Sequence, residues 1–513
     1  MATYQRPGVF IEESLQPLVD PAIGTGDYVA AFVGASGAGG PVGPTLVTSW
    51  TQFQSLYGDI RTNSDDLHYA VWQYFANGGH NAYIVRGVNT DATFASLTIN
   101  DTQGTPAAAL KVSASSAGTW ASSATSPTRL YVTIEPSTDA ARFDLTIESG
   151  TGGGLLAREQ FVDLTLDPLD ARNAVAIVNS PTVGSKYVTL EALGTWADAD
   201  NNPAAVTTGP LTGGTDGTGS PDLLAATQRL EAIDSVLTVN LPGISSNSGT
   251  TLADVVNWAA SRTNVFVVAD GPKPAADDTD AEVFTALSTM VVPASSYVAV
   301  YGPWLYLADP ASSVPGAMRL VAPGGAVMGQ YAITDASRGI HKAPAGLETS
   351  LRGVLGVRTR FTETQLDTLN QAGVNVIRQV TGAGFCIMGA RTRNTRMPDR
   401  YVNIRRCLIS LSKSLRDITR FAIFEPNNEA LWEQIEGVCE QFLITQMQSG
   451  LLKGTIPETA FFVKCDADNN PPASQNAGIV NVEVGVALHS PAEFIIIRIG
   501  QYDGGTSTTE ITA

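Results

Sequence analysis

The chain is poor in the residues that metal and cofactor sites use. Its 513 residues include four cysteines and four histidines. The cysteines are widely spaced in the last third and form no C-x-x-C pair, so we expect buried, reduced thiols and neither a zinc site nor disulfides. The histidines fall in separate segments without an H-x-x-x-H pair, so we expect no metal and no cofactor. These residues are Cys386, Cys407, Cys439, Cys465, His68, His80, His341 and His489.

Motifs of common enzyme classes are also missing. The chain has no G-x-S-x-G sequence, the sharp turn that exposes a nucleophilic serine. The glycine-rich segment 213–217 lacks the lysine of a phosphate-binding loop and reads more simply as a turn before a helix near 221. We therefore expect no catalytic residues and no enzymatic activity.

Charged residues are scarce, and their balance is acidic. They make up 16% of the chain, and 31 basic against 49 acidic residues give a formal net charge of -18. Such a chain repels phosphate, so we expect no direct nucleic-acid binding. The first residues lack the apolar core of a signal peptide, and the most apolar stretch, 291–308, is broken by proline and glycine. We therefore expect a cytoplasmic protein without membrane insertion.

Composition and residue patterns divide the chain into six segments. Its length is enough for about two to four domains. We expect a multidomain fold of mixed α/β and α+β class. The segments are an extended arm at 1–26, an α/β segment at 27–90 that packs with the central domain, an inserted β-rich outer domain at 91–204, a central α/β domain at 205–375, a C-terminal α+β domain at 376–500 and a flexible tail at 501–513.

Strand signals differ between these segments. Continuous apolar runs at 236–239 and 265–268 are typical of a sheet that is covered on both faces, and 28–34 reads as another buried strand. Between 91 and 200, short alternating runs separated by turn residues predict β structure of a different kind.

Capping residues mark the helices. Ser49 and Gly58 bracket a short helix, and Asn428 and Gly450 bracket the longest one. Alternation then predicts a strand with one apolar face, formed by Val480, Val482, Val484, Val486 and Leu488.

Basic residues concentrate in one segment. Ten of them lie between Arg378 and Arg420, where Asp399 and Asp417 are the two acidic residues. In an acidic chain this segment forms a positive region wherever it is exposed. Two interpretations stay open: the segment pairs internally with the acidic helix at 429–440, or it contacts an acidic partner.

Six motifs, in order along the chain, resemble those of contractile phage tail sheath proteins. They are Y-x-x-P-G-V-F-I-E-E from Tyr4, Y-F-A-N-G-G with A-Y-I-V-R from Tyr74, G-T-D-G from Gly214, G-P-W from Gly302, D-x-x-R-G-I-x-K-A-P-A from Asp335, and F-E-P-N-N-x-x-L-W from Phe424 with G-L-L-x-G from Gly450. The segment 91–200 carries none of them, and the polar tail after Gln501 departs from the family pattern.

The resemblance implies a structural protein. Sheath subunits polymerise as stacked sixfold rings around an inner tube and contract to drive the tube through the target cell envelope. The implied central domain is similar in fold to subtilisin without its catalytic residues, inserted domains face outward, and the C-terminal region lies inward. Implied partners are other copies of the chain, the inner tail tube protein, and baseplate and tail terminator proteins. The chain would belong to a virion tail or contractile injection particle assembled in the bacterial host cytoplasm.

Two sets of candidate contact residues follow. Both terminal segments are short, β-capable and flanked by flexible residues, as strand donation to a neighbour's sheet edge requires. The second terminal segment could instead be an internal strand, with the chain after Arg498 crossing to a neighbour. The arm candidates are Val9, Phe10, Ile11, Phe494, Ile495, Ile496 and Ile497. The tube-contact candidates are Arg391, Arg393, Arg405, Arg406, Lys413 and Arg416.

A second class of protein also fits the composition. A secreted or surface-displayed β-rich binding protein, such as an adhesin, would have the same low charge and Ser/Thr content. The α/β centre and the absence of a signal peptide argue against it. Electron microscopy separates the two classes, because a sheath protein forms hollow tubes.

Overall fold

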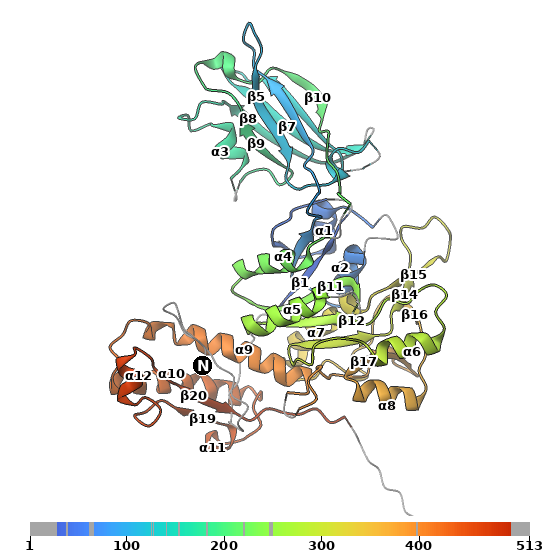
Figure 1. The fold of residues 1–513 in the computed structure, drawn as a ribbon, viewed down its shortest axis with the longest axis vertical. Coiled ribbons are helices and arrows are strands. Elements are labelled where there is room, and N and C mark those ends of the chain that lie inside the picture. Colours follow the sequence, from blue (N-terminus) through green and yellow to red (C-terminus); the bar gives the residue numbers. More distant parts are fainter. Residues whose placement is uncertain are drawn as a thin grey trace, which may run out of the picture.

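The computed structural model describes residues 28–493, apart from 37–38, 61–65, 125, 127, 140, 152–153, 181–182, 219–220, 246–249 and 397–398. The described chain forms three lobes (Figure 1). A β-sandwich stands at the top of the view, an α/β lobe lies below it, and a helical lobe extends to the lower left. We call them the sandwich (96–210), the central lobe (28–87 and 223–387) and the C-terminal lobe (402–488).

The central lobe is built on an eight-stranded sheet of order β18-β17-β13-β12-β11-β1-β3-β2. The six inner strands are parallel, and β2 and β18 add one antiparallel strand at each edge. The strands are β1 (Tyr28–Ala35), β2 (Thr45–Val47), β3 (Ala82–Gly87), β11 (Val236–Ser245), β12 (Val265–Asp270), β13 (Val298–Gly302), β17 (Val374–Val380) and β18 (Gly384–Ile387). A smaller antiparallel sheet consists of β14 (Leu305–Ala308), β15 (Met318–Val321) and β16 (Val354–Val357).

Helices cover both faces of the large sheet. One face packs Phe32, Phe266 and Tyr301 against α1 (Trp50–Tyr57), α2 (Asp66–Ala76) and α7 (Gly324–Arg338). The other face packs the alternate residues, such as Val33 and Val267, against α4 (Leu223–Gln228), η3 (Arg229–Ala232), α5 (Thr250–Arg262), α6 (Asp280–Ser288) and α8 (Glu363–Gln371). Successive strand residues point to opposite faces, so a strand covered on both sides is apolar throughout. The strands predicted from continuous apolar runs are confirmed.

The predicted capping residues also lie where expected. The Ser49 side chain accepts a hydrogen bond from the Gln52 amide, and Gly58, at φ 80°, ends α1. Asn428 caps α10 (Glu429–Gln448) by accepting from the Leu431 amide at 3.0 Å. Both predicted helices are confirmed. Each cap satisfies a backbone amide that has no partner within the helix.

The sandwich consists of two antiparallel sheets with one core. The four-stranded sheet has the order β10-β6-β7-β8, and the three-stranded sheet has the order β4-β5-β9. Their inner faces meet around Trp120, Leu145 and Val112. The elements are β4 (Ser96–Asn100), β5 (Ala108–Ala114), η1 (Thr119–Ala121), β6 (Leu130–Pro136), β7 (Phe143–Thr151), β8 (Gly154–Leu164), α3 (Ala174–Val178), β9 (Val188–Ala192), η2 (Ala199–Asn201) and β10 (Val206–Pro210).

Two chain segments connect the sandwich to the central lobe. The Asn89 side chain in the first donates to the carbonyl of Asp216 in the second, at 2.7 Å. The Asp216 carboxylate accepts from the amide and the hydroxyl of Thr119, at 2.8 and 2.5 Å. Buried Arg86, at the end of β3, donates to the Ala117 carbonyl at 2.9 Å. These bonds brace the connection from both sides.

The C-terminal lobe has its own core. Leu411, Leu431 and Ile435 pack with Phe461 and Val486 between the long helices and a two-stranded sheet. The elements are α9 (Val402–Ile418), η4 (Arg420–Ala422), α10, α11 (Pro457–Ala460), β19 (Phe461–Lys464), α12 (Pro472–Asn476) and β20 (Glu483–Val486). Within the described ranges, no helix is long and apolar enough to cross a membrane.

Three expectations differ from the structure. The expected boundary at 204 precedes β10, which pairs with β6 although its Thr- and Gly-containing sequence shows no alternation. The expected boundary at 375 cuts β17, because the β17–β18 hairpin closes the edge of the central sheet. The strand expected over 480–488 is confined to β20, although the alternate side chains of that segment do pack on the C-terminal core.

Candidate functional site: helix α9 and its junctions

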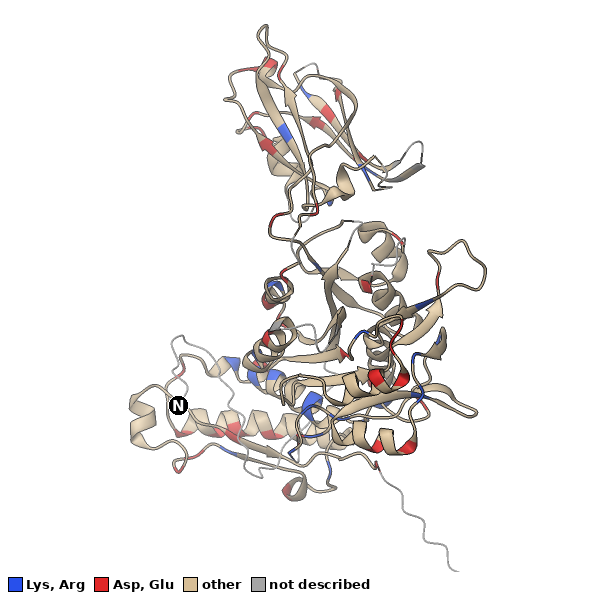
Figure 2. Cartoon of the chain, turned by 45° about the vertical axis from the view of Figure 1, so that its right-hand side comes forward, with Lys and Arg blue, Asp and Glu red and all other residues tan. Residues whose placement is uncertain are grey.

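Helix α9 carries much of the basic segment and joins two lobes. Its Val402 and Ile409 side chains belong to the core of the central lobe, whereas Cys407 and Leu411 belong to the C-terminal core. In Figure 2 the basic positions follow α9, and acidic positions follow α10. The charges of α9 therefore lie at the boundary between lobes.

Arg406 is the most deeply buried of these charges, with 1% of its surface exposed. Its guanidinium binds the Asp335 carboxylate of α7 through two contacts, at 2.5 and 2.9 Å. It also lies between two aromatic rings, 4.2 Å from the centre of Tyr28 and 4.6 Å from that of Tyr331. Burial alone would lower the pKa of Arg406, but Asp335 outweighs burial and raises it. The guanidinium stays charged.

The same contact fixes the start of the described chain. The Tyr28 hydroxyl donates to the backbone carbonyl of Arg406 at 2.5 Å, which ties β1 to α9. Tyr331 in turn shares a 2.5 Å hydrogen bond with Tyr301 of β13. Burial raises the pKa of Tyr28 well above its usual value, so this hydroxyl remains a donor. Four elements of two lobes thus meet at one buried ion pair.

Two further arginines are buried in pairs of their own. Arg405 binds Asp399 at 3.0 Å and lies 4.8 Å from the ring centre of Tyr297. Arg391 binds both oxygens of Glu493, at 2.5 and 2.8 Å, and this hydrogen bonding raises the pKa of Arg391. Glu493 is the last described residue, so the chain is anchored next to α9 at this end as well.

A second cluster of basic residues surrounds the exposed Asp234 at the far end of α9 and in the adjoining η4, where the Lys413, Arg416 and Arg420 side chains are 11%, 27% and 55% exposed. Lys413, Arg416 and Arg420 approach Asp234 to 3.2, 3.6 and 2.7 Å, and the Asp234 side chain is 60% exposed. Lys413 and Arg420 also bind Asp417. Partial burial would raise the pKa of Asp234, but hydrogen bonds from Arg420 and Lys413 outweigh it and lower the pKa. Asp234 precedes β11, so this cluster is a second link between α9 and the central lobe.

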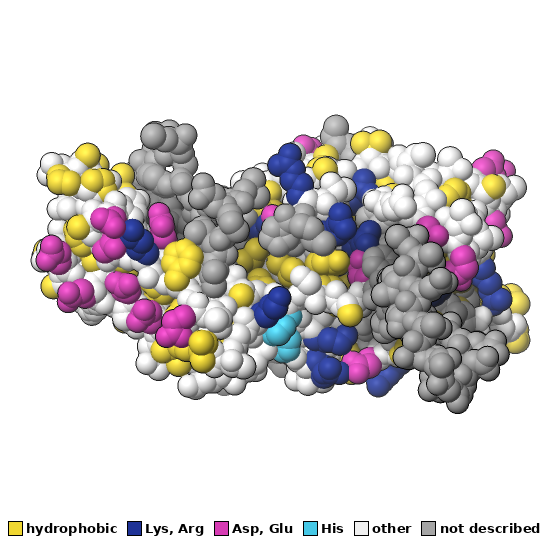
Figure 3. Space-filling view, turned by 90° about the horizontal axis from the view of Figure 1, so that it is seen from below, with side chains coloured by type: hydrophobic (Ala, Val, Ile, Leu, Met, Phe, Trp, Pro, Cys, Tyr) yellow, Lys and Arg dark blue, Asp and Glu magenta, His cyan; other side chains and the backbone are white. Residues whose placement is uncertain are grey.

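The structure favours internal pairing for this segment, although with other partners than expected. Among the described residues the acids are Asp234, Asp335, Glu363, Asp399, Asp417 and Glu493, and none of them lies on the helix 429–440. Helices α9 and α10 pack through Leu411 and Ile435, so their charged faces turn away from each other. Viewed from below, acidic side chains gather over the C-terminal lobe at the left, and basic ones lie nearer the middle (Figure 3).

The six tube-contact candidates thus lie in three different settings. Arg391, Arg405 and Arg406 are buried, so an external partner cannot reach them in this conformation. Arg393 is half-buried and donates to the Ala372 carbonyl. Lys413 and Arg416 are partly buried and belong to the cluster around the exposed Asp234. Sequence patterns did not indicate Tyr28 and Asp234 as partners of this basic segment. Asp335 lies in the D-x-x-R-G-I-x-K-A-P-A motif.

The arm candidates Val9, Phe10, Ile11, Phe494, Ile495, Ile496 and Ile497 lie outside the described residues. The C-terminal lobe carries the small β19–β20 sheet. Its strands pair antiparallel from Phe461 with Val486 to Lys464 with Glu483. In the described part of the chain this sheet has two strands, and Leu452 forms an isolated bridge with Leu488 just after β20. A sheet edge that lacks a neighbouring strand can accept a further one.

The carboxyl ends of β11 and β12 form the edge where α/β proteins often bind ligands. Here Asp270 accepts from the Gly324 amide at 2.7 Å and from the Asn240 side chain at 3.2 Å. A Cβ atom at Gly324 would lie 2.3 Å from Asn240, so the start of α7 fills this edge. Burial raises the pKa of Asp270 to about 7, although both hydrogen bonds favour the carboxylate. The edge is closed by packing.

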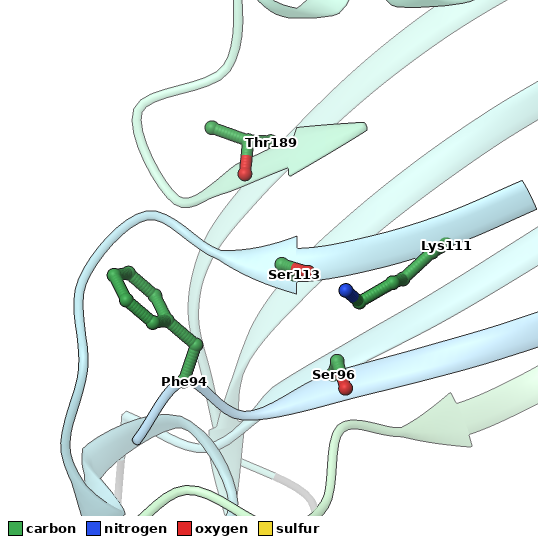
Figure 4. Close-up of a pocket in the computed structure, with 5 residues that line it drawn as sticks. All are labelled: Phe94, Ser96, Lys111, Ser113 and Thr189. Atoms are coloured by element: carbon green, nitrogen blue, oxygen red, sulfur yellow. The ribbon is translucent and has the colours of Figure 1, made fainter. Parts of the chain in front are cut away.

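A shallow pocket of about 310 Å³ lies on the three-stranded sheet of the sandwich (Figure 4). It is lined by Phe94, Ser96, Lys111, Ser113 and Thr189. Lys111 binds Glu191 at 3.3 Å on the same sheet. No histidine or carboxylate lines this pocket, and its one amine, that of Lys111, is bound by Glu191.

The described lobes differ in fold, the central and C-terminal ones meet at the buried Arg406–Asp335 pair, and the sheet edge beside Asp270 is filled. Sequence comparison gives the family. The profile of the phage tail sheath protein central domain matches residues 216–393, and that of the phage tail sheath C-terminal domain matches residues 399–501. Together they cover more than half of the chain, and the chain belongs to the phage tail sheath family.

One relative is the tail sheath protein of Vibrio phage KVP40, which is 30% identical over 156 residues. The match covers 30% of this chain and 22% of that protein, so it spans about a fifth of the relative's length.

Solved sheath structures share the fold over nearly the whole chain. The sheath complex of an extracellular contractile injection system in the contracted state has a TM-score of 0.56 at 21% identity, and the match covers 98% of this chain and 99% of that one. The helical sheath of the anti-feeding prophage, also contracted, has a TM-score of 0.54 at 20% identity, with 97% and 100% covered. The sheath tail protein of Listeria innocua has a TM-score of 0.59 at 12% identity, with 87% and 90% covered.

Proposed function

We propose that the chain is the structural subunit of a contractile tail sheath. Copies polymerise as stacked sixfold rings around an inner tail tube and contract to drive the tube through a target cell envelope, without ATP or a metal ion. The observation that carries this proposal is the match of family profiles to the central and C-terminal lobes in succession, between residues 216 and 501. The particle is a virion tail or a related injection system assembled in the bacterial cytoplasm, with baseplate and tail terminator proteins at its ends.

The terminal segments act as arms in this proposal. Residues 9–11 and 494–497 add strands to the β19–β20 sheet of neighbouring copies. Support comes from Tyr28 and Glu493, which anchor the adjoining chain to Arg406 and Arg391. Removal of residues 1–20 should therefore leave a folded, soluble monomer that forms no polymer. Normal, contractile sheaths from that truncated chain would contradict the arm model.

The central lobe serves as the rigid body of the subunit. Its parallel sheet with helices on both faces supports a likeness to subtilisin in fold, and the close packing of Gly324 on Asn240 and Asp270 supports a structural role for the sheet edge. Tube contact falls to Arg393, Lys413 and Arg416, because the three buried arginines act within the chain. An acidic tube surface would compete with Asp234 for two of them.

The sandwich faces outward and is dispensable for the polymer. The central-domain profile begins at residue 216, where the Asn89 side chain meets the Asp216 carbonyl. A deletion of residues 91–200 would remove β6 and leave its partner β10 unpaired. A better junction therefore joins Asn89 to Asp216 through a short Gly-Ser link. That variant should still form tubes. Complete loss of polymerisation by a folded variant would show that the sandwich makes essential contacts.

Electron microscopy of the purified full chain tests the proposed function. A sheath subunit forms hollow tubes of uniform diameter under polymerising conditions, and added chelator leaves them unchanged. Dispersed monomers under all conditions would favour the alternative of a surface-displayed binding protein.

A further inference from the structure

Phe424 combines two unusual properties. It is 88% exposed, and its backbone has a φ of 69°. Bulky side chains avoid positive φ because the Cβ atom then crowds the backbone. Four described non-glycine residues have positive φ, and Phe424 is the single apolar one, beside Asp163, Thr208 and Thr263.

The loop around Phe424 is fixed from both sides. Before it, the Ala422 amide donates to the Thr419 carbonyl at 3.1 Å. After it, Asn427 donates to the Ile479 carbonyl at 3.2 Å and accepts from the Trp432 indole at 2.8 Å. The strained conformation is therefore imposed by the surrounding lobe, and it holds the phenyl ring out in solvent.

Exposure alone would mean little, since single apolar side chains are common on protein surfaces. Leu169 in the sandwich is 94% exposed, but its backbone is not at positive φ. At Phe424 the fold maintains an unfavourable backbone to present an aromatic ring. Strain that surrounding structure maintains is typical of functional positions, and rigid aromatic side chains dominate the energetics of protein interfaces.

We propose that Phe424 is an anchor that packs on an exposed apolar surface of a second copy of this chain. The inference rests on the proposed function, because it assigns one contact of the sheath polymer. Apolar side chains are exposed on another lobe of the same molecule, at Leu347 and Leu355 of the central lobe. A knob on one lobe that meets an apolar surface on another makes a head-to-tail contact, the kind that builds rings and helical polymers.

The substitution Phe424→Gly tests the proposal because two effects should have opposite signs. Glycine relieves the strain at positive φ, so the melting temperature of the monomer should stay the same or rise. Loss of an aromatic anchor should raise the critical concentration for polymerisation at least about tenfold. The matched control Leu169→Ser removes an equally exposed apolar side chain and should change neither quantity.

A photo-crosslinking phenylalanine analogue at position 424 identifies the partner. In assembled sheaths it should crosslink to a second copy of the chain. Crosslinking to the tube protein, or polymerisation of Phe424→Gly at the wild-type critical concentration, would overturn the inference. Failure of the wild-type chain to form tubes would instead count against the proposed function, so the two failures are distinguishable.

Discussion

The two halves of α9 use the same residue types in opposite ways. In the first half, Arg406 is buried between aromatic rings and bound to Asp335 of the central lobe. At the far end, Lys413, Arg416 and Arg420 share the exposed Asp234. A charge left unpaired in the interior costs several kcal/mol, whereas an exposed ion pair contributes less than about 1 kcal/mol.

The difference assigns separate tasks to the two junctions. We expect the buried one to hold the central and C-terminal lobes in a fixed arrangement. If copies of the chain slide past one another in the proposed sheath, we expect the junction at Asp234 to open and re-form. The predictions below test this contrast.

The largest effect is expected for Arg406→Met. Methionine keeps much of the volume but leaves the Asp335 carboxylate buried without a partner, so we expect a loss of about 3–5 kcal/mol in the free energy of unfolding. Urea unfolding of the monomer measures it. The double variant with Asp335→Leu removes both charges and should recover most of the loss; equal instability of the single and double variants would refute a buried-pair origin.

Asp270 is a buried carboxyl group that pairs with no cation among the described residues. Its contribution to stability should change with pH in the direction opposite to that of Asp234. Its pKa is about 7 in the folded chain and near 3.8 in the unfolded one, so the folded state binds more protons in between. Stability should therefore fall as pH rises from about 4 to about 7, by on the order of 3 kcal/mol. Asp270→Asn should flatten this curve, as urea unfolding at pH 5 and pH 8 would show. A curve of unchanged slope in that variant would assign the dependence to other groups.

Tyr28→Phe makes a smaller change at the buried junction, because it removes one hydroxyl group. The ring remains beside Arg406, but the carbonyl of Arg406 loses its 2.5 Å hydrogen bond. We expect a loss of about 0.5–1.5 kcal/mol in the same unfolding experiment. Tyr28→Leu, which also removes the cation–ring contact, should lose more; if both variants match wild type, Tyr28 does not brace α9.

Asp234→Asn should have the smallest effect, below about 1 kcal/mol at low salt, and none at about 1 M salt, where exposed charges are screened. The folded pKa of Asp234 is lowered, so its contribution exists above pH 4 and is lost as the pH falls below that value. Unfolding at two salt concentrations measures this. A loss that persists at high salt would mean that this junction also behaves as a buried one.

Sequence patterns predicted the parts of this molecule that depend on neighbouring residues. The caps at Ser49 and Asn428 and the apolar strands at 236–239 and 265–268 are local signals, and each was confirmed. Strand β10 was missed because its place depends on pairing with β6, more than 70 residues away in the chain.

The charged junctions were harder to predict for the same reason. The basic segment was recognised, but in the described part of the chain the acidic helix at 429–440 supplies none of its partners, because α9 and α10 pack through their apolar faces. Arg406 meets an acid 71 residues earlier, and Arg391 meets one 102 residues later. The F-E-P-N-N motif that begins at Phe424 can be read from the sequence. The positive φ of Phe424 cannot, because it depends on tertiary packing.

Cryo-electron microscopy of the sheath before and after contraction tests the central claim most directly. The Arg406 guanidinium should stay within about 3 Å of the Asp335 carboxylate in both states, because the two lobes move together. The contacts of Asp234 with Lys413, Arg416 and Arg420 should differ between the states. A broken Arg406–Asp335 pair in either state would contradict the account.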